Sequence, residues 1–522
     1  MNRDQLRDPA AASAAVLLVA AAVLVGRHIE GADHTLFVNW PPLLASWGPH
    51  VGPGTPAALA TAIVVAGYGP AVAARLSWRA LLGASCATAL VWTWSLALVD
   101  GWQRGVAHRL ASRYEYLQAV DRFHDVPAAL RDFTHHILLG SPAPWPAHVA
   151  GHPPASTLTF VLLDRVGLGG GGWAGVWCIG AGATTCVAVL VTVGRLASRE
   201  TARRAAPFLA LAPSAVWAGT SADGYFAAVA AWSVALWACA TTGRRPRTAA
   251  FGAGLLFGLT CYLSYGLALI ALIGAGTLLL QRPRGRDLPR LSVPLLCGTA
   301  VVPVLFGVAG FNWWDAYRLL VTRYDQGVGG VRPFGYWVWA NLACTVLCAG
   351  LATAPALVRA GRALLARRVP GGGGRFAPGP TEQGPAGGRS DGRAAARPGP
   401  ALEPVGHTAA AVEGAAATPP GTAGRPDAGA CALLPAPVAA ARTAERDNSS
   451  AEARLAMLVL CALFALLAAD LSGMSKAETE RIWLPFVAWL TPACALLPRP
   501  RLWLTVQAAG ALLVNHLLLT GW

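Results

Sequence analysis

Long apolar runs recur along nearly the whole chain, and they limit the possible folds more than any other feature of the sequence. A helix that crosses a membrane needs about 20 mostly apolar residues, and runs near that length alternate with short polar loops between residues 9 and 520. Hydrophobic residues make up 55% of the 522 residues and charged residues only 13%, whereas a soluble domain carries about 25% charged residues. We therefore predict an all-α, polytopic transmembrane helix bundle.

We expect about 13 spans, with boundaries good to a few residues. The first follows Arg3 and Arg7 and is interpreted as a retained helix, because no convincing cleavage site of a signal peptide follows it. Several others are short, so the loops joining 205–219 to 225–241 and 249–262 to 265–280 should lie below the membrane surface. The predicted spans are 9–26, 56–74, 80–99, 172–193, 205–219, 225–241, 249–262, 265–280, 291–310, 337–358, 455–470, 484–497 and 503–520.

Short clusters of arginine alternate with loops of mixed charge, and this alternation predicts the orientation of the chain. Cytoplasmic loops of membrane proteins are enriched in Lys and Arg, so we place the arginine clusters and the N-terminus in the cytoplasm and the C-terminus outside a cell membrane. The net charge of +15 then reflects topology rather than a surface for nucleic acid. The clusters are Arg3/Arg7, Arg75/Arg79, Arg195–Arg204, Arg244–Arg247, Arg282–Arg290, Arg359–Arg368 and Arg499/Arg501.

Composition divides the chain into five predicted parts. Residues 369–453 are rich in Gly, Pro, Ala and Arg with few aromatic residues, a composition that cannot bury enough apolar surface to fold, so we predict a disordered cytoplasmic linker. The other parts are three N-terminal spans (1–99), a large extracytoplasmic loop with an interfacial helix at 155–168 (100–171), the central spans (172–368) and three C-terminal spans (454–522).

The predicted outer loop between residues 100 and 154 contains the densest group of residues able to do chemistry. Carboxylates at Asp100, Glu115 and Asp121 stand among aromatic residues, including Tyr116. His152 precedes two prolines that suit the first turn of a helix, which would hold the imidazole at a fixed place.

Two further outer segments carry charge. Asp223 lies between two apolar runs, where a charge costs about 2.5–3.5 kcal/mol unless it is paired or hydrated. The segment around residues 475–483 contains Glu478, Arg481 and Lys476, the only lysine of the chain. A compact ammonium is not interchangeable with a guanidinium at a tight anionic site, so Lys476 is a candidate contact for a phosphate; a chance position at a helix end is the alternative.

These segments together resemble a family of membrane enzymes. The acidic, aromatic first large outer loop, the "HPP" sequence that opens a helix and the "SADGY" turn are similar to those of GT-C glycosyltransferases that use polyprenyl-phosphate sugars, such as the protein mannosyltransferases and the lipid A aminoarabinose transferase. The later stretches "GFNWWDAY" and "SGMSKAETERIWLPF" resemble uncharacterised actinobacterial integral membrane proteins. In this chain the loop follows the third predicted span, whereas in the family it follows the first.

The resemblance implies a glycosyltransferase whose acidic base is Glu115 or Asp121, with Asp100 as a third candidate. The donor site is expected to include substrate-binding residues from several loops: His152, Asp223, Lys476, Glu478, Arg481 and Tyr116. Positive charge at the departing phosphate would come from Lys476 and Arg481 or from a divalent metal ion. A transporter or flippase and a non-catalytic protein of envelope assembly remain the alternatives; the sugar, the acceptor, the oligomeric state and a metal requirement are left open.

Overall fold

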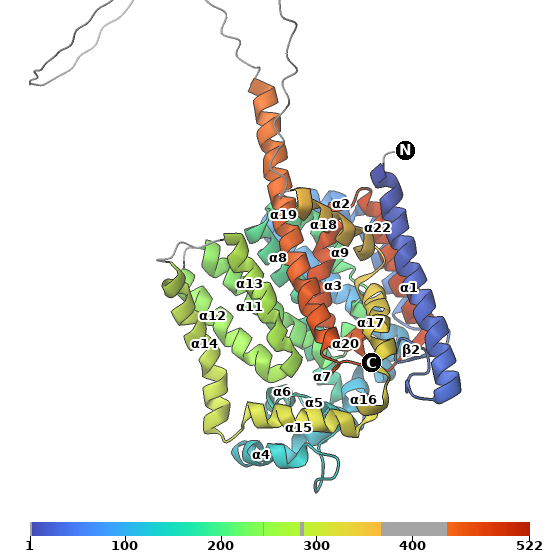
Figure 1. Ribbon diagram of the computed structural model, residues 1–522, viewed down its shortest axis with the longest axis vertical. Coiled ribbons are helices and arrows are strands. Elements are labelled where there is room, and N and C mark those ends of the chain that lie inside the picture. Colours follow the sequence, from blue (N-terminus) through green and yellow to red (C-terminus); the bar gives the residue numbers. More distant parts are fainter. Residues whose placement is uncertain (1–2, 244, 282–286, 367–435, 522) are drawn as a thin grey trace, which may run out of the picture. The chain divides into compact units, whose positions relative to one another are not determined.

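The structure, a computed structural model, is almost entirely helical (Figure 1). It describes residues 3–243, 245–281, 287–366 and 436–521. Within these ranges the one sheet has two short strands, β1 (Ala45–Trp47) and β2 (Leu518–Thr520), which pair antiparallel. The prediction of an all-α bundle is confirmed, whereas the pairing of segments so far apart in the sequence was not predicted.

The helices follow in chain order and are connected mostly by short turns. Up to residue 196 they are α1 (Arg3–Asp33), α2 (Thr55–Arg75), α3 (Trp78–Ala97), α4 (Val126–Asp132), α5 (Ala147–Gly151), α6 (Ala155–Arg165), α7 (Gly171–Ala183) and α8 (Thr185–Leu196). Then follow α9 (Arg199–Ala210), α10 (Ala215–Ala218), α11 (Ala222–Thr242), α12 (Pro246–Leu263), α13 (Ile270–Gln281), α14 (Leu288–Val308), α15 (Trp313–Gln326), α16 (Val328–Val331), α17 (Phe334–Ala349) and α18 (Thr353–Ala366). The last are α19 (Ala436–Leu471), α20 (Thr479–Ile482), α21 (Leu484–Leu490) and α22 (Pro500–Leu517).

Short helical turns of other kinds connect these helices. The 3-10 helices are η1 (Leu98–Asp100), η3 (Arg109–Ala111), η4 (Tyr116–Phe123), η5 (Phe133–His136), η6 (Tyr265–Leu269) and η7 (Thr491–Leu496), and η2 (Gln103–Ala107) is one turn of π-helix.

Seven helices of the described residues are long and apolar enough to cross a membrane, which indicates a membrane protein. An eighth candidate is the pair α17 and α18, which meet at an angle of 100°. The predicted number of 13 spans is therefore not confirmed. The seven are Leu6–Asp33, Thr55–Arg75, Trp78–Asp100, Gly171–Leu196, Ala222–Thr242, Leu288–Val308 and Asp447–Leu471.

Several of the predicted spans are divided in the structure, and two of the breaks lie at a glycine or a proline. The run 337–358 breaks at Gly350, whose φ of +85° is one that glycine adopts readily and other residues rarely do. The run 205–219 breaks between α9 and α10, where Pro213 has no N–H to continue the ladder of hydrogen bonds. Both breaks place irregular backbone within the bundle, where other groups must satisfy it.

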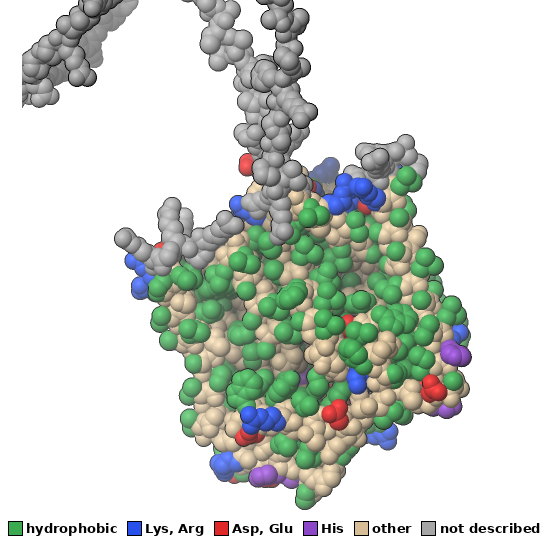
Figure 2. Space-filling view, in the orientation of Figure 1, with side chains coloured by type: hydrophobic (Ala, Val, Ile, Leu, Met, Phe, Trp, Pro, Cys, Tyr) green, Lys and Arg blue, Asp and Glu red, His purple; other side chains and the backbone are tan. Residues whose placement is uncertain are grey.

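Several of the predicted cytoplasmic segments meet at one end of the bundle, which we call the arginine end and define by Arg203, Arg204 and Arg359. Arg203 donates a hydrogen bond to the carbonyl oxygen of Leu76 (2.6 Å) at the end of α2, and Arg359 of α18 lies 2.8 Å from Asp8 of α1. At the opposite end lie α4, α5, α6, α15 and α16, which we call the loop end (Figure 1). Figure 2 shows a broad band of hydrophobic side chains between charged groups at the two ends.

The predicted linker can be compared with the structure only at its C-terminal end. Residues 369–435 lie outside the described residues, and α19 begins at Ala436. The last part of the predicted 369–453 linker is therefore helical.

The helices α12 and α14 pack closely because glycines face each other's backbone. A Cβ atom on Gly254 would lie 1.9 Å from the carbonyl oxygen of Leu295, and one on Gly298 would lie 2.1 Å from that of Phe251. Small residues allow such close approach between membrane helices. The contact leaves no room for a methyl group at either position.

We predict that Gly254→Ala destabilises the protein by about 1–3 kcal/mol, because the new methyl group forces the two backbones apart. Thermal unfolding of the purified protein in detergent would measure the change. Gly307→Ala on the same α14 is the control, since a Cβ there meets nothing within 4 Å; equal effects of the two substitutions would contradict the proposed close contact.

Candidate functional site

Four segments far apart in the sequence bring charged side chains together near the loop end. Arg481 of α20 lies with Nη1 3.1 Å from Oδ2 of Asp223 on α11 and with Nη2 3.2 Å from Nε2 of His148 on α5. The other ring nitrogen of His148, Nδ1, lies 2.8 Å from Oε1 of Glu115, which precedes η4. We call these four residues the Arg481 cluster.

Local structure fixes the side chains of the cluster. Asp223 lies in the first turn of α11, where a carboxylate is favoured by the helix dipole, and its side chain accepts a hydrogen bond from the hydroxyl of Ser221, the N-cap residue. The backbone N–H of His148 donates to the carbonyl oxygen of Tyr114 (3.0 Å), which joins α5 to the segment that carries Glu115. Arg481 follows Glu478, which has the left-handed φ of 61° and turns the chain into α20.

The hydrogen-bond roles in the cluster follow from Arg481, which can only donate. Nε2 of His148 therefore accepts, and the proton of the neutral ring is on Nδ1, which faces Glu115. The neutral ring of His148 thus lies between Arg481 and Glu115 and contacts both. The position of the proton is deduced from these contacts.

The cluster is almost inaccessible to solvent, and its one guanidinium lies among two carboxylates and a neutral imidazole. Glu115 is 4% exposed, Asp223 3% and Arg481 3%. Burial alone would raise the pKa of Glu115, but His148 and Arg481 outweigh burial and hold this pKa below its usual value. Burial alone would lower the pKa of Arg481, but Asp223 and Glu115 outweigh it and raise this pKa. Both groups are therefore charged at neutral pH.

Two buried oxygen atoms beside these charges lack partners. Among the residues that the structure describes, neither Oε2 of Glu115 nor the hydroxyl of Tyr116 has a hydrogen-bond partner. Burial raises the pKa of Tyr116 well above its usual value, so its hydroxyl keeps its proton. The site thus offers one acceptor and one donor that are not used inside the protein.

Aromatic rings surround the cluster on one side. The ring of Tyr116 stacks on that of Phe160 at 5.5 Å and meets that of His152 edge-on at 5.7 Å. Nδ1 of His152 lies 2.8 Å from the carbonyl oxygen of His148. Burial lowers the pKa of His152 to about 4, so this ring is neutral at pH 7.

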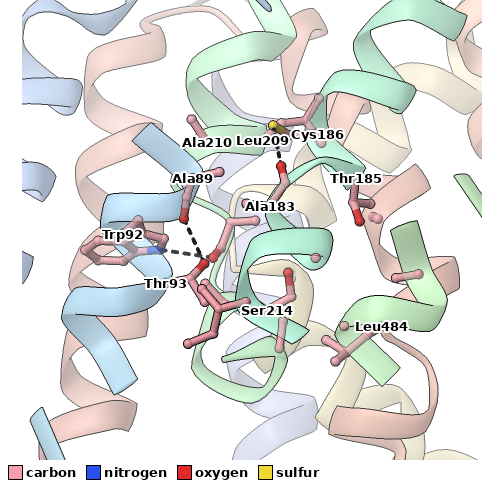
Figure 3. A pocket seen from close by; sticks show the side chains of 18 residues that line it. Ala89, Trp92, Thr93, Ala183, Thr185, Cys186, Leu209, Ala210, Ser214 and Leu484 are labelled. Atoms are coloured by element: carbon pink, nitrogen blue, oxygen red, sulfur yellow. Dashed lines mark hydrogen bonds between the residues drawn. The ribbon is translucent and has the colours of Figure 1, made fainter. Parts of the chain in front are cut away.

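A small cavity of about 70 Å³ lies in the bundle near the cluster (Figure 3). It is lined by Gly224, which follows Asp223, and by Ser214 at the break between α9 and α10. Trp92 donates to the carbonyl oxygen of Ala212 (3.2 Å) and so satisfies part of the broken backbone. The cavity is large enough for a few water molecules, each of which needs polar partners.

A second ionic group connects the cluster to Lys476 and Glu478. Arg332, which precedes α17 and is 6% exposed, donates to the carbonyl oxygen of Lys476 (2.8 Å) and lies 3.4 Å from Oε1 of Glu478. The other oxygen of Glu478 lies 3.9 Å from Arg481. The ammonium of Lys476 itself donates to the carbonyl oxygen of Gly329 (2.9 Å).

The predicted site residues therefore fall into two sets. The structure brings six of the predicted residues together, namely Glu115, Tyr116, His152, Asp223, Glu478 and Arg481. Lys476 is joined to them through Arg332. Asp100 instead contacts Arg109 (2.9 Å), Arg104 and His50. Asp121 is exposed on η4, without a hydrogen bond or ion pair among the described residues.

Sequence reasoning missed two members of the site, His148 and Arg332. His148 lies four residues before His152, and this spacing was a usable signal. Nothing in the sequence distinguishes Arg332 from the other arginines. Among the described residues no group of three or more His, Cys, Asp or Glu side chains is placed to hold a metal ion.

Comparison with known proteins identifies no family, so the class of protein is described from the fold and the site. No protein-family model matches this sequence, and no curated protein matches it significantly. The chain is a helical membrane protein with a buried ionic cluster near one end of its bundle.

We predict that Arg481→Gln destabilises the protein by about 3–5 kcal/mol, because it leaves Asp223 and Glu115 as buried charges without their cation. Adding Asp223→Asn to this variant should restore part of the loss. Thermal unfolding in detergent measures both. Arg318→Gln is the control, because that side chain is 80% exposed in its pair with Asp315 and such pairs contribute little; an equally small effect at Arg481 would show that the cluster is not needed for stability.

We also predict that stability falls as the pH is lowered from about 6.5 towards about 4. The pKa of His152 is lower in the folded protein than its ordinary value of 6.5, so the unfolded chain takes up the proton first and unfolding is favoured in this window. His152→Gln should flatten the dependence there, whereas His28→Gln, at an exposed site, should not. Unfolding midpoints across the pH range test this, and equal pH profiles for wild type and His152→Gln would refute it.

Proposed function

We propose that the protein is an integral membrane glycosyltransferase of the GT-C type, which transfers a sugar from a polyprenyl-phosphate donor to an envelope acceptor. The observation that supports this best is the buried, ionised carboxylate of Glu115, whose Oε2 has no partner among the described residues. It lies in one cluster with a guanidinium, and glycosyl transfer from a lipid phosphate needs both a base and a positive charge.

In this proposal Oε2 of Glu115 accepts the proton of the acceptor hydroxyl. The hydroxyl oxygen attacks the anomeric carbon of the sugar, and the bond from that carbon to the phosphate oxygen breaks. The bonding electrons leave with the polyprenyl phosphate. With base and leaving group on opposite faces, a single displacement inverts the anomeric centre.

Arg481 stabilises the departing phosphate. Its closest ionic contact is Asp223 at 3.1 Å, whereas Glu478 lies at 3.9 Å. A donor phosphate would replace the weaker contact, and Glu478 would keep its pairing with Arg332. Tyr116 and the neutral ring of His152 would face the sugar, since aromatic and uncharged groups suit a sugar surface.

Substrates need an opening that the described conformation lacks, because the charged members of the cluster are only 3–4% exposed. The segment before α20 is a candidate for this movement. Gly473, Ala477 and Glu478 all have positive φ, a conformation that costs energy for residues other than glycine. A shift of this segment would move Glu478 away from Arg481 and expose the guanidinium.

We also propose the topology that accompanies this function: about 13 spans with short and broken helices included, the arginine end in the cytoplasm and the loop end outside the cell membrane. The gathering of Arg203, Arg204 and Arg359 at one end supports this orientation.

Two alternatives have different support. The burial and the internal ionic contacts of the cluster also suit a non-catalytic protein of envelope assembly, in which the cluster only holds the loop end together. The 100° break between α17 and α18 is of a kind that transporters use, but residues 350–352 are Gly, Leu and Ala and offer no side chain for an ion or a polar substrate.

We predict that Glu115→Gln lowers the transfer rate by about 10²–10⁴-fold, the usual contribution of a positioned base, while the protein remains folded. Asp121→Asn is the matched control, because it removes the charge of an exposed carboxylate in the same loop. The assay follows release of polyprenyl phosphate from a panel of polyprenyl-phosphate sugars in proteoliposomes, with thermal unfolding as the measure of folding. Full activity of Glu115→Gln would exclude this residue as the base, and wild-type protein inactive on the whole panel would favour the non-catalytic alternative.

A further inference from the structure

A separate cavity lies at the arginine end. It has a volume of about 340 Å³ and lies between the end of α2, the first turns of α9, the middle of α18 and the segment from η7 to α22. Its charged lining residues are Arg203, Arg204, Arg359 and Glu200. The cavity therefore has an excess of positive charge, and apolar residues such as Phe208 form much of its remaining wall.

The three arginines differ in how far their donors are used inside the protein. Arg359 makes two hydrogen bonds to the carboxylate of Asp8, and Arg203 donates to carbonyl oxygens at the end of α2. Arg204 donates to Asn448 of α19 (3.1 Å), but its Nη1 lies 3.9 Å from Glu452, beyond hydrogen-bond distance. Among the described residues, the buried Nε of Arg204 has no partner.

The start of α22 adds to the positive potential of the cavity. Pro500, its first residue, lines the cavity, and the preceding Arg499 makes no side-chain cap. Pro500 has no N–H, and the N–H groups of Leu502 and Trp503 donate to the carbonyl oxygen of Arg499. The dipole of this 18-residue helix still favours an anion near its first turn. This feature is independent of the arginine side chains.

We propose that this cavity, the arginine pocket, binds a phosphate group. Guanidinium groups with free donors and a helix N-terminus are the usual partners of phosphate. The pocket lies at the end of α2, a candidate membrane span, and its wall is partly apolar, so the phosphate of an anionic lipid head group fits it as well as free phosphate does. Basic pockets between membrane helices recognise such head groups.

Binding there would join parts of the chain on both sides of the undescribed residues 367–435. Arg359 belongs to α18, which precedes them, and Arg204 contacts Asn448 of α19, which follows them. A bound phosphate would accept from the guanidinium of Arg204 and hold these helices together. The ligand is therefore expected to raise the stability of the protein, whether or not the proposed transferase activity exists.

The experiment uses the full-length protein, delipidated in a neutral detergent, and follows thermal unfolding by tryptophan fluorescence. Phosphatidylglycerol, phosphatidylcholine and inorganic phosphate are added separately. Phosphatidylglycerol should raise the midpoint by about 2 °C or more beyond phosphatidylcholine, and Arg204→Gln should remove this difference. If inorganic phosphate alone gives a rise that depends on Arg204, the pocket takes soluble phosphate; if only the lipid does, it takes the head group.

Two further variants control for general effects of charge and packing. Arg79→Gln removes an exposed arginine at the same end and should keep the full response to the lipid. Glu452→Gln leaves Arg204 in place and removes its acidic neighbour, so the response should be kept or increased even if the contact with α19 weakens. An equal response of wild type and Arg204→Gln, or an equal loss in Arg79→Gln, would overturn the proposal.

Discussion

The loop end of this protein depends on one buried cation. The guanidinium of Arg481 contacts Asp223 and His148, and through His148 it reaches Glu115, so that one side chain joins α20, α11, α5 and the start of η4. Removing such charges from water is costly, and only close partners with good geometry offset the cost. The segments that carry these partners must therefore occupy fixed places before the loop end can fold.

Much of this arrangement could be predicted, because charged residues are few in an apolar chain and so indicate where a site lies. Asp223 was a candidate because a charge at membrane depth needs a partner. Glu115 and Arg481 were candidates through the family resemblance, and the structure brings the three together. The sequence does not indicate which of the three carboxylates is buried in the cluster. In the structure Glu115 is buried there, Asp121 is exposed, and Asp100 forms an ion pair with Arg109 outside the cluster. That choice depends on the 3-10 turns of the loop, which are too short for a period to be recognised in the sequence.

The fold was predictable to a similar degree. Apolar runs located the helices, but hydropathy does not register a change in backbone conformation, so the break at Gly350 was missed and the number of spans was not confirmed. The two ends also use arginine differently. At the arginine end, the arginines contact carbonyl oxygens and only a few carboxylates. At the Arg481 cluster, carboxylates surround a single cation.

The pairing of β1 with β2 affects the order in which the protein can be assembled in a membrane. Ala45 lies opposite Thr520, and the backbone of His50 also bonds to that of His516. During synthesis the segment after α1 emerges long before its partner exists. Its edge must stay unpaired until α22 has been made, so this small sheet can form only after the helices that lie between its two strands in the sequence.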